Sequence, residues 1–113
     1  MTRNEEKLCA DIVEHYGFLA QTRILQEECA ELIMAASKIN RRYDDFKDGK
    51  ISEDAYLNNF IEELADVRIM LEQMNQGLKK HYECDYEYEI RKKLKRQKAR
   101  MENELRKNEN ESR

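Results

Sequence analysis

Hydrophobic residues recur at three- and four-residue intervals along most of the chain, a spacing typical of amphipathic α-helices. The pattern predicts four helices, at residues 4–16, 19–42, 53–80 and 87–107. Gly17 is expected to end the first, because glycine readily adopts the left-handed conformation found at helix C-termini. The sequence therefore predicts an all-α protein, an antiparallel bundle of about four helices.

The helical period is lost between residues 43 and 51, where the pair Asp48-Gly49 is typical of a turn. We expect one substantial loop in this segment. Ser52 follows the loop and precedes two acidic residues, so it is expected to be the N-cap of the third helix.

Length and composition favour one domain with a modest core. The chain has 113 residues, no Pro, three Gly and 40% charged residues, which is typical of a helical protein with short loops. The expected domain covers residues 1–106, with a helical core at 4–82 and the basic helix at 87–107. Residues 107–113 are expected to form a frayed tail.

Three further features bear on assembly and location. The hydrophobic share of 40% is low for a self-sufficient globule, so we expect a homo-oligomer. No apolar run is long enough to span a bilayer and the N-terminus lacks a signal-peptide pattern, so a cytoplasmic protein is expected. Cys9, Cys29 and Cys84 have no CxxC spacing, which argues against a disulfide framework or a zinc site.

Charge is distributed unevenly along the chain. Residues 1–84 carry a net charge of −6 and residues 85–113 carry +3. Seven Lys or Arg residues fall within 91–100, which suits either a solvated helix face or phosphate contacts. Nucleic-acid binding is not expected, because no aromatic residues interrupt the basic run and the whole chain is acidic.

Carboxylates interrupt the apolar stripe of the second predicted helix. At about 100° per residue, Glu28 lies in the middle of the stripe and Glu31 at its edge, with Glu27 just beyond. A carboxylate that faces a protein core is unfavourable unless a base, a shifted pKa or a metal ion compensates it. The stripe consists of Ile24, Leu25, Leu32, Ala35 and Ile39.

The third predicted helix has the same arrangement. Glu63 and Asp66 lie together on one edge of its stripe. If the two helices are neighbours, four carboxylates surround one point, which suits a hard cation with oxygen ligands: Mg²⁺ first, with Mn²⁺ as an alternative. This stripe consists of Phe60, Leu64, Val67, Leu71, Met74 and Leu78.

The two acidic stretches resemble the paired motifs of the all-α NTP pyrophosphatase superfamily, the MazG-like group. Its pattern EExxE followed by EExxD matches Glu27-Glu28-Cys29-Ala30-Glu31 and Glu62-Glu63-Leu64-Ala65-Asp66. The resemblance extends over residues 15–80. The 30 residues between the motifs lie toward the long end for this family, with the excess in the 43–51 loop.

The resemblance implies a Mg²⁺-dependent hydrolase that cleaves a nucleoside triphosphate between its α and β phosphates, giving a monophosphate and pyrophosphate. Such enzymes serve nucleotide-pool housekeeping and are usually dimers or dimers of dimers. The implied metal ligands are Glu28, Glu31, Glu63 and Asp66. Glu27 and Glu62 are implied as outer residues that orient water.

Further residues are candidates for contacts with the substrate. Hydrolysis of a phosphoanhydride needs a proton acceptor, for which Glu27 and Glu31 are the candidates. Gln21 and Asn59 are the predicted contacts of the base, with Phe18 or a Tyr stacking on it. The predicted phosphate-binding residues are Lys38, Lys93, Arg96 and Arg100.

Two other functions fit a helical bundle with buried acids. A di-iron carboxylate site needs Glu-x-x-His pairs, but neither His15 nor His81 stands three residues after a Glu, so this class is excluded. A non-catalytic helical interaction module, or an inactive relative of the pyrophosphatases, remains as the alternative. A specific Mg²⁺ or Mn²⁺ site separates the enzyme from that module.

Overall fold

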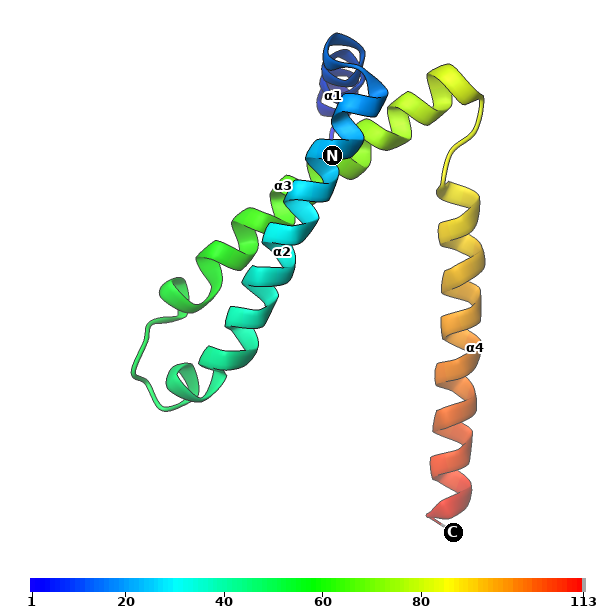
Figure 1. Cartoon of the computed structure of the whole chain (residues 1–113). Helices are drawn as coiled ribbons and strands as arrows, with labels where there is room; N and C mark the ends of the chain where they lie inside the picture. The colour runs from blue at the N-terminus through cyan, green and yellow to red at the C-terminus, as the bar shows by residue number, and fades with distance from the viewer. Residues whose placement is uncertain (113) are drawn as a thin grey trace. The chain divides into compact units, whose positions relative to one another are not determined.

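The computed structural model describes residues 1–112, and within them the only regular secondary structure is helix (Figure 1). The four helices are α1 (Arg3–Tyr16), α2 (Phe18–Lys47), α3 (Glu53–Tyr82) and α4 (Glu87–Glu111). The chain divides into two units, Met1–Glu83 and the segment from Cys84 onward. The single domain that the sequence predicts, with a helical core and a basic C-terminal helix, stays a prediction.

The first unit is built on a long helical hairpin. α2 and α3 run antiparallel along each other, and α1 packs mainly on α3 (Figure 1). Gly17 separates α1 from α2 with a φ of 96°, and its N–H donates to the carbonyl of Val13. Ser52 caps α3, since its hydroxyl accepts from the N–H of Ala55 at 3.1 Å. Both local predictions are therefore confirmed.

The predicted loop at 43–51 is shorter than expected. α2 continues as helix to Lys47, so only residues 48–52 connect it to α3. A contact between the two helices accounts for the difference. The rings of Phe46 and Tyr56 stack with centroids 4.6 Å apart, and the Tyr56 hydroxyl donates to the carbonyl of Ile39 at 2.9 Å. These contacts stabilise the last turns of α2.

The hydrophobic core is small, and part of its predicted lining is wrong. Ile24 on α2 and Leu64 and Leu71 on α3 belong to the predicted apolar stripes but are exposed. Leu8 on α1 is exposed as well. On α1 the buried position is taken by Cys9, one residue along from Leu8. The buried hydrophobic residues are Cys9, Val13, Ala35, Val67, Met70 and Met74.

Polar side chains occupy the rest of the interior near the C-terminal half of α3. Gln21 on α2 donates from its amide to the amide oxygen of Gln73 on α3 at 2.8 Å, and both residues are buried. Glu72 is also buried, and it accepts from Gln76 at 2.9 Å and pairs with Arg68 at 3.5 Å. These bonds compensate groups that would otherwise oppose burial.

Gly77 on α3 lies against the ring of Phe18 at the start of α2. A Cβ atom at this position would lie 2.6 Å from the Phe18 ring, closer than any ordinary contact. Gly77→Ala is therefore expected to lower the free energy of unfolding by about 1 kcal/mol, because overpacking costs about 1–3 kcal/mol and the better helix propensity of Ala returns roughly 1 kcal/mol. Urea denaturation with an unchanged m-value measures this effect.

Phe18→Leu is the matched second change for this prediction. Leu has a smaller side chain, so Gly77→Ala should cost less in the Phe18→Leu background than in the wild type. A Gly77→Ala protein that is as stable as the wild type would show that Phe18 can move aside without loss.

The second unit is the single long helix α4. None of its described residues is buried. The helix extends to Glu111, four residues beyond its predicted end at 107, so most of the segment expected to be a frayed tail is helical. Residue 113 of that predicted tail lies outside the described residues.

Candidate metal centre

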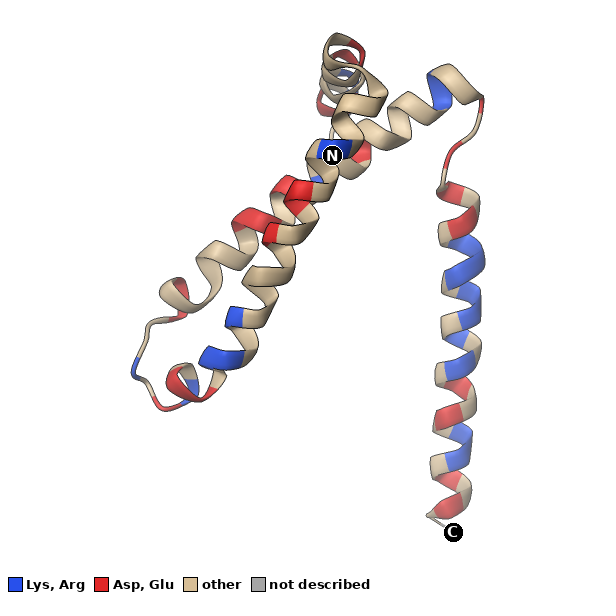
Figure 2. Cartoon of the chain, in the orientation of Figure 1, with Lys and Arg blue, Asp and Glu red and all other residues tan. Residues whose placement is uncertain are grey.

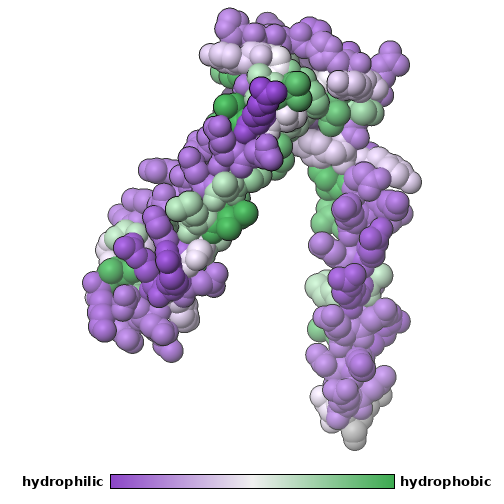
Figure 3. Space-filling model, in the orientation of Figure 1, coloured by the Kyte–Doolittle hydropathy of each residue, from purple (hydrophilic) through white to green (hydrophobic). Residues whose placement is uncertain are grey.

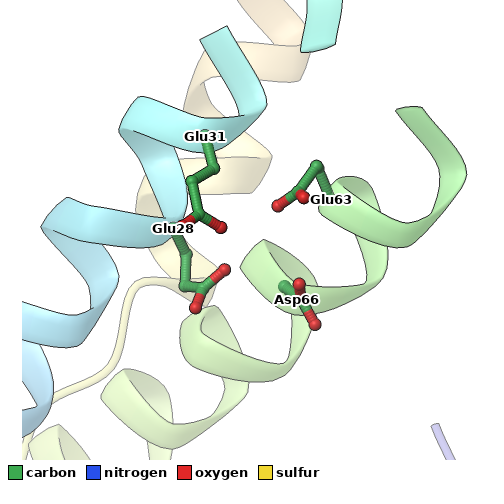
Figure 4. A group of neighbouring side chains, drawn as sticks. All are labelled: Glu28, Glu31, Glu63 and Asp66. Atoms are coloured by element: carbon green, nitrogen blue, oxygen red, sulfur yellow. The ribbon is translucent and has the colours of Figure 1, made fainter. Parts of the chain in front are cut away.

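Two carboxylates from α2 and two from α3 meet in the space between these helices. Glu28 and Glu31 stand one helical turn apart, as do Glu63 and Asp66, and spacing of this kind places each pair on one side of its helix. Figure 4 shows the four side chains gathered in the space between the two helices. One oxygen from each of them lies within 4.8 Å of the others. The predicted cluster of four acids is therefore present.

On each helix, the first acid of the pair is more buried than the second. Glu28 and Glu63 are half-buried, whereas Glu31 and Asp66 are exposed. The Oε2 atoms of Glu28 and Glu63 are fully buried and, among the described residues, have no hydrogen-bond partner. A buried carboxylate oxygen without a donor is unfavourable. Both atoms thus lack the compensation that a cation would supply.

The pKa values of the two half-buried acids respond to this environment. Burial raises the pKa of Glu28, and the negative charges of Glu31, Asp66 and Glu63 raise it further. Burial likewise raises the pKa of Glu63, with the charge of Glu31 as the next cause. Burial and the neighbouring negative charges therefore disfavour the ionised forms of Glu28 and Glu63. A bound cation would favour the ionised forms instead.

The donor set fits a hard divalent cation. Carboxylate oxygens are the ligands that Mg²⁺ and Mn²⁺ prefer, and the cluster contains no sulfur or imidazole ligand. Opposite oxygens around one Mg²⁺ ion lie about 4.2 Å apart, close to the spread of this cluster. Two of the four acids are exposed, so solvent reaches the site. Figure 2 shows the red acidic segments of α2 and α3 side by side along the hairpin.

The structure places the other predicted site residues of the first unit in different surroundings. Glu27, Lys38 and Asn59 are exposed on the same two helices as the acids. Gln21 is buried, and its amide is engaged by Gln73, so contact with a nucleobase requires that bond to open. The catalytic, phosphate-binding and base-binding roles of these residues remain predictions.

The basic residues of the C-terminal helix belong to the second unit. Lys93, Arg96 and Arg100 are all exposed on α4. Figure 2 shows the run of basic residues along the first half of this helix. Their predicted contact with phosphate remains a prediction.

Sequence reasoning missed a cavity at the far end of α3 from the acids. It has a volume of about 450 Å³ and lies beside an ion pair of Glu14 with Lys80, in which the charged atoms are 3.2 Å apart. Glu14 also contacts His81, and the hydrogen bond from His81 lowers the pKa of Glu14. Asp66 and His81 are fifteen residues apart, or about 22 Å along the helix. The lining residues are Val13, Glu14, Gly17, Phe18, His81 and Tyr82.

The buried polar residues Glu72, Gln73 and Asn75 were also missed as part of the interior. The sequence does contain a signal for them. Four polar residues lie between Leu71 and Leu78, where the helix is otherwise apolar, so some of them must share its buried face. The Oδ1 atom of Asn75 has no hydrogen-bond partner among the described residues.

Comparison with known proteins provides no relative for this chain: no family model, no curated protein and no solved structure matches it. Among the described residues, no helix has the length and apolar character needed to cross a membrane.

Proposed function

We propose that this chain is a Mg²⁺-dependent nucleoside triphosphate pyrophosphohydrolase of the MazG-like kind. It would cleave an NTP or dNTP to the monophosphate and pyrophosphate. One observation carries the proposal: the four acids that converge between α2 and α3 are members of the paired EExxE and EExxD motifs, and two of them hold buried oxygens that lack a donor.

The four acids are the proposed metal ligands: Glu28, Glu31, Glu63 and Asp66. When bound, Mg²⁺ supplies positive charge for the triphosphate and acidifies water. The protein's own task is to keep these carboxylates close together before the substrate arrives. The two long antiparallel helices do this, since their backbones fix the spacing within each pair and their packing fixes the spacing between pairs.

Glu27 or Glu31 is the proposed proton acceptor. Both are exposed on α2 within the first motif, so water can reach either side chain. The oxygen of water attacks the α-phosphorus, and one proton of the water passes to the carboxylate. The bond from the α-phosphorus to the bridging oxygen breaks, and pyrophosphate leaves. Lys38 lies seven residues beyond Glu31, about 10 Å along the helix, a distance that suits contact with the distal phosphates.

Self-association is part of the proposal, as a dimer or a dimer of dimers. Ile61, Leu64 and Leu71 share one exposed stripe of α3. Exposed apolar stripes of this kind are typical of surfaces that another subunit covers. A second copy that covered this stripe would also complete the small core of the first unit.

A panel of NTPs and dNTPs with Mg²⁺ tests the function. The expected product is pyrophosphate in equal amount to the nucleoside monophosphate, with activity lost on chelation and restored by Mg²⁺ or Mn²⁺. Orthophosphate as the product would overturn the proposed position of cleavage. No turnover of any nucleotide, with no specific Mg²⁺ site by calorimetry, would favour the non-catalytic helical module.

A further inference from the structure

α4 carries an exposed apolar stripe that runs from Ile90 to Leu105. Ile90, Leu94, Met101 and Leu105 are 40%, 58%, 54% and 56% exposed. At about 100° per residue they fall within an arc of about 60° on the helix surface. Green hydrophobic atoms interrupt the purple surface of this helix in Figure 3. α4 has 25 residues, and none of its described side chains is buried.

The residues of the stripe are spaced symmetrically along the helix. Its spacings are four, seven and four residues, so it is symmetric about a midpoint between Gln97 and Lys98. Two copies of α4 placed antiparallel about this midpoint bring Ile90 level with Leu105 of the second copy, and Leu94 level with Met101. The apolar contacts of such a pair are self-complementary, as a two-fold interface requires.

Charged residues beside the stripe distinguish antiparallel from parallel pairing. Between Ile90 and Leu94 the residues that flank the stripe are basic, with Arg91 on one side and Lys93 on the other. Between Met101 and Leu105 they are acidic, with Glu102 on the side of Arg91 and Glu104 on the side of Lys93. A parallel pair would place like charges together, which is unfavourable.

An antiparallel pair joins opposite charges on both sides of the stripe. With the midpoint fixed by the apolar residues, Arg91 lies within two residues, about 3 Å along the axis, of the level of Glu102 of the second copy. Lys93 has the same relation to Glu104 of the second copy. Long Arg and Lys side chains span such an offset easily. The apolar register and the charge pattern therefore select the same alignment independently.

We propose that α4 is a self-association element. It pairs antiparallel with α4 of a second copy, with the two-fold axis at the midpoint between Gln97 and Lys98. Near the midpoint, Lys98 comes close to Lys98 of the second copy, and the two positive charges repel. Its ammonium lies 3.9 Å from Glu102 in the same helix, which offsets that repulsion. Arg96 points away from the stripe and remains available to other ligands. This pairing does not depend on the proposed hydrolase activity.

Disulfide cross-linking of the full-length chain tests the alignment. The background carries Cys29→Ala and Cys84→Ser, which remove the two thiols that are not buried. Gln97→Cys places a thiol beside the two-fold axis and should cross-link to itself. Leu94→Cys should cross-link to Met101→Cys in a mixture of the two proteins. Leu94→Cys alone should not, because its two copies would lie about 10 Å apart along the axis.

Ala99→Cys is the matched control, since residue 99 lies on the face of α4 opposite the stripe. Gln97→Cys is expected to cross-link at least about tenfold faster than this control, because pairing holds its two thiols at a high effective concentration. The combined change Arg91→Glu and Lys93→Glu should abolish that difference. Adding Glu102→Lys and Glu104→Lys should restore it, because the charge pairs are then reversed and not lost.

Two outcomes would overturn the pairing. Leu94→Cys that cross-links to itself as fast as to Met101→Cys would show a parallel arrangement. Gln97→Cys that cross-links no faster than Ala99→Cys would show that α4 does not pair with itself. In that case, binding of the full-length chain to vesicles that contain anionic lipid would assign the stripe and its basic edges to a membrane surface.

Discussion

Pyrophosphate release is expected to fall by at least about 100-fold in Glu31→Gln and in Asp66→Asn, since loss of even a supporting residue around a metal ligand costs 10–100-fold. Each change replaces the carboxylate of a proposed metal ligand by a neutral amide of nearly the same shape. The cluster loses one of its four carboxylates, so its affinity for Mg²⁺ falls. Initial rates over a range of Mg²⁺ concentrations, scored as pyrophosphate, measure the loss.

The fold should survive both substitutions. Glu31 and Asp66 are exposed, and each contributes negative charge to a crowded cluster, so its removal relieves repulsion in the metal-free protein. Far-ultraviolet circular dichroism should therefore match the wild type. Glu53→Gln is the control, because Glu53 is an exposed acid on the same helix as Asp66 and lies outside the cluster. Wild-type turnover in either site variant would show that the ligand assignment is wrong.

In the metal-free protein, the stability contributed by Glu28 and Glu63 is expected to fall as the pH rises above about 4.5, the ordinary pKa of a Glu side chain. The folded-state pKa values of Glu28 and Glu63 are raised, so the folded chain binds more protons than the unfolded chain. The stability contributed by these two groups is fully present below their unfolded pKa. It is lost as the pH rises through their folded pKa values.

Mg²⁺ should restore that stability at neutral pH. A ligand that binds only the folded state at 100 times its Kd adds about 2.7 kcal/mol to the free energy of unfolding. For a chain of this size the gain corresponds to roughly 10–20 °C in Tm. Binding should also release protons and strengthen with pH, because the ligands must be ionised. Thermal unfolding at several pH values, with chelator or with Mg²⁺, measures both effects.

Glu63→Gln distinguishes the contribution of the acid cluster to the pH dependence of stability from that of the other carboxylates. Glu14, whose pKa is lowered, contributes stability that is lost as the pH falls, so the whole-protein profile combines opposite slopes. The difference between wild type and Glu63→Gln isolates the cluster: the variant should lose less stability as the pH rises and gain less from Mg²⁺. A Tm unaffected by both Mg²⁺ and Mn²⁺ would contradict a cation site.

The candidate site was largely predictable because its parts are local. The spacing of Glu28 to Glu31 and of Glu63 to Asp66 fixes each pair on one face of a helix whatever the rest of the chain does. That the two faces oppose each other depends on how α2 and α3 pack. The spacing in the sequence carries no information on the distance between the pairs. The 4.8 Å spread of the four oxygens is a product of the tertiary structure.

The sequence by itself determined the helices and the signals at their ends. Gly17 and Ser52 act through their own backbone and hydroxyl, which need no distant partner. Tertiary contacts decided the rest. The stack of Phe46 on Tyr56 prolongs α2, and packing on α3 buries Cys9 while Leu8 is exposed. The physical reason is that capping involves neighbours in the chain, whereas burial depends on which surfaces of separate helices meet.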